Sequence, residues 1–235
     1  MSQPSRWLKR SSVKSSEWNE KSGTRSSQID WKHYAESRQR KMDPRVTEFQ
    51  CIMPLKNIPS VLQNGILSNE RAGKLPHYSI AMPEVQERRD PKPIPGGFKL
   101  HQYANLYFHA RNPMMYSRKE KATELCVLCV SLEVLKLAGV VITDRNAAGN
   151  WVRFLAPSQW RVLDFDRIFA THWRDSDRFE YYDRKSKKCA EVLVPHVVEP
   201  RFFLGARVVN ETVEGQLRAL GFSLPITVDT GLFFR

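Results

Sequence analysis

One glutamate stands where a buried strand is expected, in the segment KKCAEVLVP at residues 187–195. Strand side chains alternate between two faces, so Glu191 shares one face with Cys189 and Leu193. A carboxylate in that position is half buried, and leaving it without a partner costs about 3–5 kcal/mol. The sequence leaves two explanations open: an arginine or a backbone amide satisfies the carboxylate, or the carboxylate has a chemical role.

A second motif with a chemical signature, the C-x-x-C of Cys126 and Cys129, does not predict a metal site. It lies in the apolar segment ELCVLCVSLEVL, where a strand points the two thiols to opposite faces, and no second pair completes a zinc site. We therefore expect buried thiols in a cytoplasmic protein, and no bound metal. Glycine-rich phosphate-binding motifs are also absent from the sequence, which argues against a Rossmann or P-loop nucleotide site.

The charge balance points to a polyanionic partner. The chain has 37 Lys and Arg against 25 Asp and Glu, a formal net charge of +12 in 235 residues. Such an excess favours nucleic acid or an anionic surface. No apolar run approaches the roughly 20 residues of a membrane span, and the N-terminus lacks the apolar stretch of a secretion signal, so we expect no membrane association.

Half of this charge lies in residues 1–45, which have a net charge of +6, ten serines and no sustained apolar period. This segment cannot bury enough apolar surface to fold alone, so we predict a flexible basic arm. Trp7, Trp18, Trp31 and Tyr34 are interleaved with its cations, which suits stacking on bases or docking on the folded body.

Residues 46–235 have the pattern of a globular domain. A helix is predicted in IPSVLQNGIL, where Pro59 lies in the first turn and Gly65 ends the helix, and another in VEGQLRAL near the end of the chain. Short segments rich in β-branched and aromatic residues predict strands: FQCIM, ANLYFHA, LCVLCVSLEVL, GVVIT, EVLVP and ARVVN. Short strands with few small helices indicate an α+β domain around a mixed sheet.

The order of five motifs resembles the DarT family of NAD-dependent DNA ADP-ribosyltransferase toxins. The motifs are NIPSVLQNGILSNERA, AMPEVQERRD, LHQYANLYFHARNPMMY, GVVITDRNAA and KKCAEVLVP, and the resemblance runs from about residue 50 to about residue 210. It implies an ADP-ribosyltransferase-like fold, with a bent, split sheet around a cleft for NAD. It also implies transfer of ADP-ribose to a base of single-stranded DNA, and a macrodomain-type antitoxin as partner.

The resemblance assigns Glu191 as the catalytic glutamate. A carboxylate near the ribose stabilises the positive charge that develops as nicotinamide leaves, as carboxylates do in glycosidases. The stretch QERRD places Arg89 or Arg88 where the family has a functional arginine, which would hold the diphosphate or help to activate the attacking base. The alternative is that both arginines are exposed at a helix end.

The resemblance also indicates where NAD would bind. Tyr107 and Phe108 lie in the strand where an aromatic ring could stack on nicotinamide, although strand alternation predicts a core position for one of the two. The family usually has a polar residue followed by threonine and histidine in the first strand, and this chain has Cys51-Ile52-Met53-Pro54 instead. Backbone groups of this strand can still hold the amide of nicotinamide. The expected cofactor-binding residues are Cys51, Met53, Asn57, Leu67, Tyr107 and Phe108.

Nucleic-acid contacts are expected from TDRNAAGNWVRF and from the polar segment before Glu191, which combine cations for phosphates with rings for unpaired bases. The expected residues are Arg145, Trp151, Arg153, Arg178, Tyr181, Tyr182 and Arg184. Arg111 and Asn112 are expected to support the cleft wall. Two alternatives stay open: an RNA-directed transferase, since net charge does not distinguish the two nucleic acids, and a catalytically weak binding module, because of the altered first strand.

Overall fold

The computed structural model describes residues 42–234, so most of the predicted arm, residues 1–41, lies outside the described residues. The last residues of the predicted arm contact the folded domain. Arg45 Nη2 pairs with Asp166 at 2.9 Å, and its guanidinium lies 5.1 Å from the centre of the Phe169 ring. No helix in the described part of the chain is long and apolar enough to cross a membrane.

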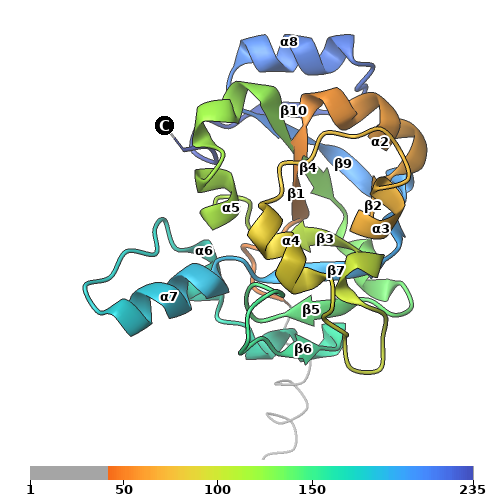
Figure 1. Cartoon of the computed structure of the whole chain (residues 1–235). Coiled ribbons are helices and arrows are strands. Elements are labelled where there is room, and N and C mark those ends of the chain that lie inside the picture. Colours follow the sequence, from red (N-terminus) through yellow and green to blue (C-terminus); the bar gives the residue numbers. More distant parts are fainter. Residues whose placement is uncertain (1–41, 235) are drawn as a thin grey trace, which may run out of the picture. The chain divides into compact units, whose positions relative to one another are not determined.

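Two sheets form within residues 42–234 (Figure 1). The larger has the strand order β10-β9-β4-β1-β3-β7-β5-β6, and the smaller pairs β2 with β8. Strand β10 runs parallel to β9, whereas β9, β4, β1, β3, β7, β5 and β6 pair antiparallel, so the larger sheet is mixed. The strands are β1 Phe49–Pro54, β2 Ile66–Leu67, β3 Tyr103–Tyr107, β4 Leu125–Val130, β5 Val141–Thr143, β6 Phe154–Leu155, β7 Glu191–Pro195, β8 Val197–Val198, β9 Phe203–Val208 and β10 Ile226–Val228.

The larger sheet is split between β1 and β3. Strand β1 pairs with β4 from Phe49 to Pro54, whereas it meets β3 at the single pair Gln50–Tyr107. On its other side β3 pairs with β7 along its whole length, and the last of these pairs joins Tyr107 to Glu191. The two halves of the sheet are therefore joined at Tyr107, next to Glu191, and separate from that point onward. This arrangement confirms the predicted α+β fold with a split, mixed sheet.

Short helices connect and cover the strands. The α-helices are α2 Ile58–Asn64, α3 Asn69–Ala72, α4 Pro83–Arg89, α5 Pro113–Tyr116, α6 Phe165–Phe169, α7 Arg178–Lys187 and α8 Glu211–Ala219, and the 3-10 helices are η1 Leu55–Asn57, η2 Leu100–Gln102, η3 Lys119–Glu124, η4 Leu132–Lys136, η5 Pro157–Val162 and η6 Pro200–Phe202. Figure 1 shows α8 at one end, beside β10, whereas α6 and α7 project to the side near β5.

The predicted helix in IPSVLQNGIL is confirmed as α2, with proline at its start and Gly65 at its end. Gly65 has φ = +77°, a conformation that suits glycine, and a Cβ there would collide with the backbone oxygen of Val198. Glycine is thus required both for the turn and for the close approach of β8. The helix predicted in VEGQLRAL is confirmed as α8, which begins two residues earlier, with Asn210 as its N-cap.

Helix α7 forms in the polar segment before Glu191, where the sequence analysis assigned no helix. All of its side chains are at least partly exposed, so it lacks the apolar stripe by which helices are recognised. Polar contacts stabilise it instead: Asp177 caps its N-terminus by accepting from the Glu180 amide, and Lys187 pairs with Asp183 at 3.0 Å one turn away.

The main core lies between the sheet and the helices. The predicted alternation of β7 is confirmed, since Ala190, Val192 and Val194 belong to this core while Glu191 faces the other way. All four cysteines are buried and none forms a disulfide, as expected.

Candidate active site

A cavity of about 1030 Å³ opens at the split between β1 and β3. Pockets for small ligands usually measure about 300–1,000 Å³, so this cavity can hold a dinucleotide. Among the described residues, Glu191 is the one acid that lines it, whereas six cations do: Arg88, Arg89, Arg111, Lys119, Arg174 and Lys185. Such a lining favours a ligand that carries several phosphates.

Glu191 lies in this cavity at the first position of β7, with 1% of its surface exposed. Its Oε1 accepts a hydrogen bond from the Ala147 amide at 2.9 Å and one from Arg89 Nη1 at 3.2 Å, and its Oε2 accepts from the same nitrogen at 3.1 Å. The backbone amide of Glu191 donates to Thr143 Oγ1 at 2.9 Å. An arginine and a backbone amide therefore both satisfy the carboxylate, and strand pairing together with Thr143 fixes its position.

The structure distinguishes the two candidate arginines. Arg89, at the end of α4, is buried and forms the ion pair with Glu191, whereas Arg88 is exposed and has no acidic partner within the described residues. Within residues 42–234, the side-chain hydrogen bonds of Arg89 all use Nη1, which leaves its Nε and Nη2 donors without a protein partner. Arg88 also lines the cavity, at its exposed edge.

Strand alternation separates Tyr107 from Phe108. Tyr107 lines the cavity directly opposite Glu191, and burial, together with the charge of Glu191, raises the pKa of its phenol well above the usual value. The phenol is therefore a hydrogen-bond donor at neutral pH. Phe108 does not line the cavity. It is 2% exposed and packs against Phe49 and Phe165 in the core, so its expected role in cofactor binding is corrected.

The first strand contributes an apolar cavity wall. Cys51 and Met53 line the cavity as expected, together with Leu67. Burial raises the pKa of the Cys51 thiol to about 12, so this residue presents a neutral group to a ligand. The side chains of Cys51 and Met53 therefore give this wall of the cavity a weakly polar, uncharged surface.

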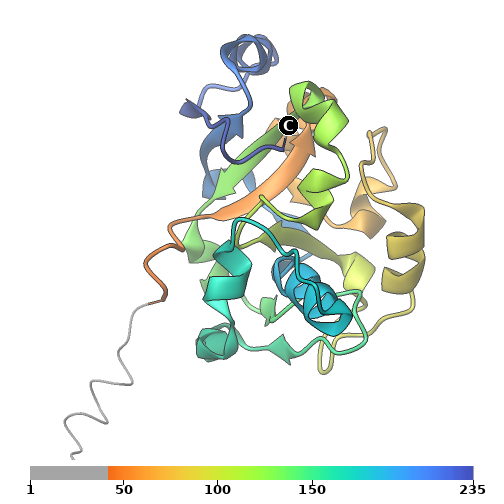
Figure 2. The same cartoon turned by 90° about the vertical axis from the view of Figure 1, so that its left-hand side faces the viewer.

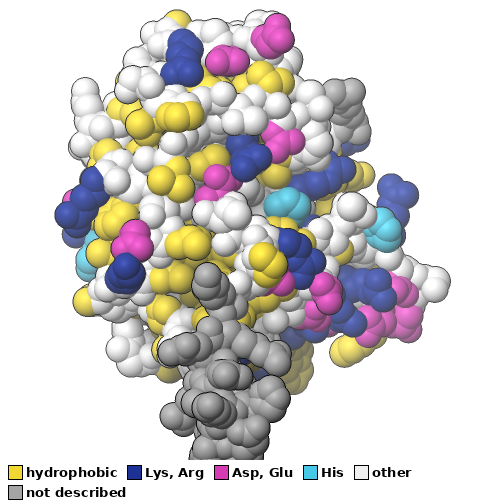
Figure 3. All heavy atoms as spheres, turned by 180° about the vertical axis from the view of Figure 1, so that it is seen from behind, with side chains coloured by type: hydrophobic (Ala, Val, Ile, Leu, Met, Phe, Trp, Pro, Cys, Tyr) yellow, Lys and Arg dark blue, Asp and Glu magenta, His cyan; other side chains and the backbone are white. Residues whose placement is uncertain are grey.

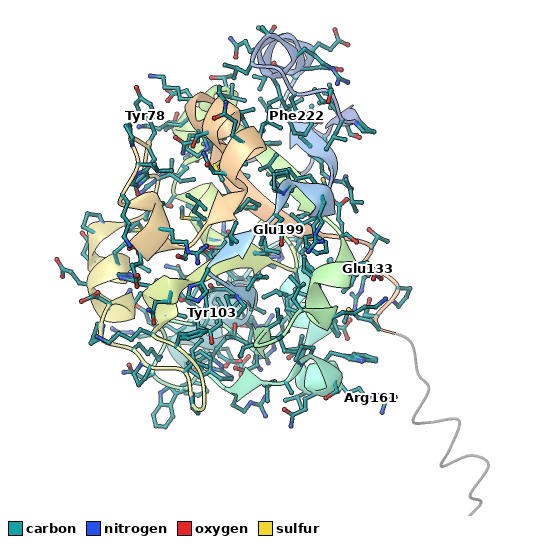
Figure 4. All side chains as sticks on the ribbon, turned by 90° about the vertical axis from the view of Figure 1, so that its right-hand side faces the viewer. Tyr78, Tyr103, Glu133, Arg161, Glu199 and Phe222 are labelled. Carbon is teal, nitrogen blue, oxygen red and sulfur yellow. The ribbon has the colours of Figure 1, made fainter. Side chains whose placement is uncertain are left out.

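Residues 73–82, which we call the strap, connect α3 to α4 and form another wall of the cavity. Asn57 holds the strap in place, since its Nδ2 donates to the Tyr78 carbonyl at 2.9 Å and its Oδ1 accepts from the Tyr78 amide at 2.9 Å. Arg118 Nε donates to a second strap carbonyl at 2.9 Å. In Figure 4, Tyr78 lies at the outer edge of the molecule, while Tyr103 of β3 lies inside it. Asn57 lines the cavity as expected, but its amide is engaged with the strap.

The expected nucleic-acid residues fall into two groups. Tyr181 lines the cavity, whereas the other six are absent from its lining. Three of those six are arginines paired with acids: Arg145 with Asp183 at 3.0 Å, Arg153 with Asp144 at 2.8 Å, and Arg184 with Asp175 at 3.0 Å. The remaining three, Trp151, Arg178 and Tyr182, are exposed.

Sequence reasoning missed several residues of the cavity. Lys119, Arg174 and Lys185 line it as cations, and three rings, Tyr116, Trp173 and Phe234, line it from separate parts of the chain. Arg111, expected to support the wall, does line the cavity, and Asn112 supports it indirectly by capping α5. The alternation of rings and cations within YSRK and THWR was an available signal, but the contribution of Phe234 depends on the fold. Among residues 42–234, no group of three His, Cys, Asp or Glu side chains is arranged to hold a metal.

Comparison with known proteins agrees with this site. The family profile described as ssDNA thymidine ADP-ribosyltransferase, DarT, matches residues 51–234. A DNA ADP-ribosyl transferase from Thermus sp. (strain 2.9) is 32% identical over 163 residues, which cover 64% of this chain and 76% of the relative. A DNA ADP-ribosyl transferase-DNA ADP-ribosyl glycohydrolase fusion protein from Thermosipho africanus (strain H17ap60334) is 29% identical over 82% of this chain and 51% of its own length. This chain therefore spans about half of that fusion protein.

Solved structures show the same fold. The structure of Thermus sp. 2.9 DarT in complex with ADP-ribosylated ssDNA superposes with a TM-score of 0.72 at 23% identity, and covers 83% of this chain and 100% of the other. The structure of Thermosipho africanus DarTG in complex with ADP-ribose gives a TM-score of 0.69 at 27% identity, over 80% of this chain and 51% of the other. The profile match over most of the chain and the 32% identity to the Thermus relative show that this chain belongs to the DarT family of ssDNA thymidine ADP-ribosyltransferases.

Proposed function

We propose that this protein transfers ADP-ribose from NAD to thymidine in single-stranded DNA and releases nicotinamide. The observation that carries the proposal is the buried pair of Glu191 and Arg89 on the floor of a cavity whose lining holds six cations and one acid. A diphosphate and a DNA strand both match this positive lining, and the cavity volume suits a dinucleotide with an acceptor base.

Glu191 acts on the ribose of NAD. Its carboxylate is held rigidly by Ala147 and Arg89 in a buried site, so it stabilises the positive charge that develops at the anomeric carbon as nicotinamide leaves. Because the hydrogen bonds are in place before the reaction, little reorganisation is needed. Arg89 positions the carboxylate through Nη1 and offers its remaining donors to an oxygen of the dinucleotide or of the acceptor base.

The reaction exchanges one glycosidic bond for another. The bond between the anomeric carbon and the nicotinamide nitrogen breaks, and a bond forms between that carbon and a ring nitrogen of thymine. Thymine in DNA uses N1 to bind deoxyribose, so N3 is its available ring nitrogen, and N3 loses a proton as it attacks. Glu191 is the one carboxylate that lines the cavity within the described residues, and we assign it as the acceptor of this proton.

The test is transfer of label from NAD to defined oligonucleotides. We expect the purified protein to label a single-stranded DNA that contains thymidine, and not the same sequence in which cytidine replaces every thymidine. Glu191→Gln keeps the size of the side chain but removes its charge, so transfer should fall by about a hundredfold or more. Glu87→Gln changes an exposed glutamate of α4 and serves as the matched control, with transfer unchanged.

Other outcomes separate the alternatives. Labelling of RNA in place of DNA would replace the proposal with an RNA-directed transferase. Tight binding of oligonucleotides without transfer to either would indicate a nucleic-acid-binding module in which the apolar first strand has abolished NAD chemistry.

We also propose a partner protein that removes ADP-ribose from the modified DNA, of the macrodomain type expected from the family. The Thermosipho africanus relative supports it, since its name describes a transferase fused to a DNA ADP-ribosyl glycohydrolase. Both substrates of the proposed reaction occur in the cytoplasm, where we expect the protein to act. Expression of the chain should stop growth of a host cell, and co-expression of a glycohydrolase of this type should restore it.

A further inference from the structure

Three aromatic rings meet at one side of the cavity, away from α4. They are Tyr116 at the end of α5, Trp173 in the loop between α6 and α7, and Phe234 at the end of the described chain, and we call them the aromatic corner. Figures 1 and 2 both show α5 beside the C-terminal end of the described chain. Segments far apart in the sequence thus build one feature, which the proposed chemistry of Glu191 does not require.

The three ring planes are nearly perpendicular to each other. Tyr116 meets Trp173 at 85° with ring centres 5.7 Å apart, and meets Phe234 at 88° and 5.2 Å. Trp173 and Phe234 meet at 75° and 5.9 Å. Trp173 is buried behind the other rings at 8% exposure, whereas Tyr116 is 44% exposed and can offer its ring to a ligand. A flat group can stack on the exposed ring of Tyr116.

The aromatic corner is fixed in place by Arg111. Its Nη1 donates to the carbonyls of Gly231 at 2.8 Å and Phe233 at 2.7 Å, and its guanidinium lies 4.0 Å from the centre of the Phe234 ring. These contacts hold the end of the described chain against the cavity. A rigid platform binds a flat ligand more tightly than a mobile one, because little entropy is lost on binding.

Cations surround the aromatic corner. Arg111 lies over the Phe234 ring and Lys119 Nζ lies 5.6 Å from the centre of the Tyr116 ring, while Arg174, which follows Trp173 in the chain, and Lys185 line the same cavity. A flat platform with several cations matches a nucleotide of a single strand, in which each base is followed by a phosphate. The diphosphate of NAD needs fewer cations, and Arg89 on α4, beside Glu191, is already placed to serve it.

We propose that the aromatic corner is a subsite for one unpaired base next to the acceptor thymidine, stacked on Tyr116. This proposal rests on the proposed function, because it takes the single-stranded DNA from there. The subsite makes Tyr116 a binding residue that selects where along a strand the reaction occurs. The chemical class of its ligand is a nucleobase of the DNA strand, and not the adenine of NAD.

The test measures binding without catalysis. In the Glu191→Gln protein, we would measure affinity for a labelled 12-nucleotide DNA with a single thymidine, and for versions in which one neighbouring nucleotide at a time is abasic. We expect one abasic position to weaken binding about tenfold, in line with the value of one stacked base. Adding Tyr116→Ala should reduce this effect to less than about twofold, and Tyr116→Phe should restore it.

A matched control uses Phe98, whose exposure of 45% is close to the 44% of Tyr116 but which lies outside this cavity. Phe98→Ala should leave the abasic effect at about tenfold. Phe234→Leu provides a second variant of the aromatic corner that keeps an apolar side chain, and it should weaken the abasic effect. Thermal unfolding of each variant confirms that it is folded.

Two results would overturn the proposal. In the first, each abasic position weakens oligonucleotide binding as much in the Tyr116→Ala variant as in its parent, or no abasic position weakens binding to the parent. In the second, Tyr116→Ala in the active enzyme raises the KM for NAD and leaves oligonucleotide affinity unchanged, which would assign the corner to adenine. Failure of the proposed function is a different result, since label transfer by the unaltered enzyme would then be absent while the abasic effect persists.

Discussion

Cations of the cavity and cations around α7 differ in their partners. On the side of α7 away from the cavity, Asp183 accepts from Arg145, Arg167 and Lys187, and Arg184 pairs with Asp175. Within the described residues, Arg88, Arg174 and Lys185 line the cavity without an acidic partner. The two regions are neighbours, yet acids neutralise one and leave the other positive.

Net charge alone therefore does not locate a binding site. Figure 3 shows a face on which Lys and Arg side chains lie close to Asp and Glu side chains, as they do around α7. Exposed pairs of this kind contribute little to stability, and they also reduce the attraction for phosphates. An unpaired cation facing a cavity keeps its full charge for a ligand. Partners, and not residue type, decide which cations can hold a nucleic acid.

The largest effect is expected when the two neighbouring arginines of α4 are changed, since one has an acidic partner and the other has none within the described residues. Arg89→Met should reduce label transfer by about a hundredfold or more, because Glu191 loses the partner that positions it. It should also lower the free energy of unfolding by about 3–5 kcal/mol, since it leaves a buried charge without its ion-pair partner. Transfer assays at saturating NAD and chemical denaturation measure the two effects.

Arg88→Met is the matched control for Arg89→Met. Arg88 is exposed, so its loss should change transfer less than about fivefold and leave stability unchanged. Equal losses in both variants would show that positive charge near the cavity matters more than the contact with Glu191.

Strand alternation predicted the parts of the site that lie on the sheet. It placed Glu191 and Cys189 on one face of β7, and it required that one of Tyr107 and Phe108 point into the core. The structure shows that Phe108 does so. The strands themselves were predicted from β-branched and aromatic segments, because packing in a sheet selects such residues.

The parts of the site that lie on loops could not be predicted in this way. Arg145 pairs with Asp183, which lies 38 residues further along the chain, so the local sequence does not reveal this partner. The rings of the aromatic corner are separated by 57 or more residues along the chain and meet only through the fold. Local patterns report local structure, whereas pairing and stacking across the chain depend on tertiary contacts.

Lys188, a buried cation near the cavity, is a third kind of cation, which is neither paired with an acid within the described residues nor exposed to a ligand. Lys188 is 1% exposed and donates to the carbonyls of Ile168 and Ala170. Burial lowers the pKa of Lys188 to about 8. Burial and, to a smaller extent, the charge of Lys188 lower the pKa of His109 from 6.5 to about 4. Within residues 42–234 Lys188 has no acidic partner, and its charge adds to the effect of burial in keeping the His109 imidazole neutral.

The pH dependence of stability tests this arrangement. Between about pH 6.5 and pH 4 the unfolded chain binds a proton at His109 that the folded chain does not, so stability is lost as the pH falls through this window. At pH 5 the loss from His109 is about 2 kcal/mol relative to pH 7.5. His109→Phe should remove this part of the pH dependence, as measured by urea denaturation at the two pH values. An unchanged dependence in the variant would mean that His109 titrates normally.

The smallest effect gives the sharpest test of the two cation regions. Two double variants are compared. One removes two cations of the cavity, Arg174→Ala/Lys185→Ala, and the other removes two arginines that are paired with acids, Arg153→Ala/Arg184→Ala. Each variant loses two positive charges, so the long-range attraction for DNA falls equally in both. The cavity variant should bind a single-stranded oligonucleotide about tenfold more weakly, and the slope of log K against log salt should fall by about 1.4, or 0.7 for each lost phosphate contact. The paired variant should lose less than about threefold, because its arginines already have acidic partners. Equal losses and equal slopes would mean that net charge alone drives binding, and the distinction between the two regions would then have no consequence for DNA.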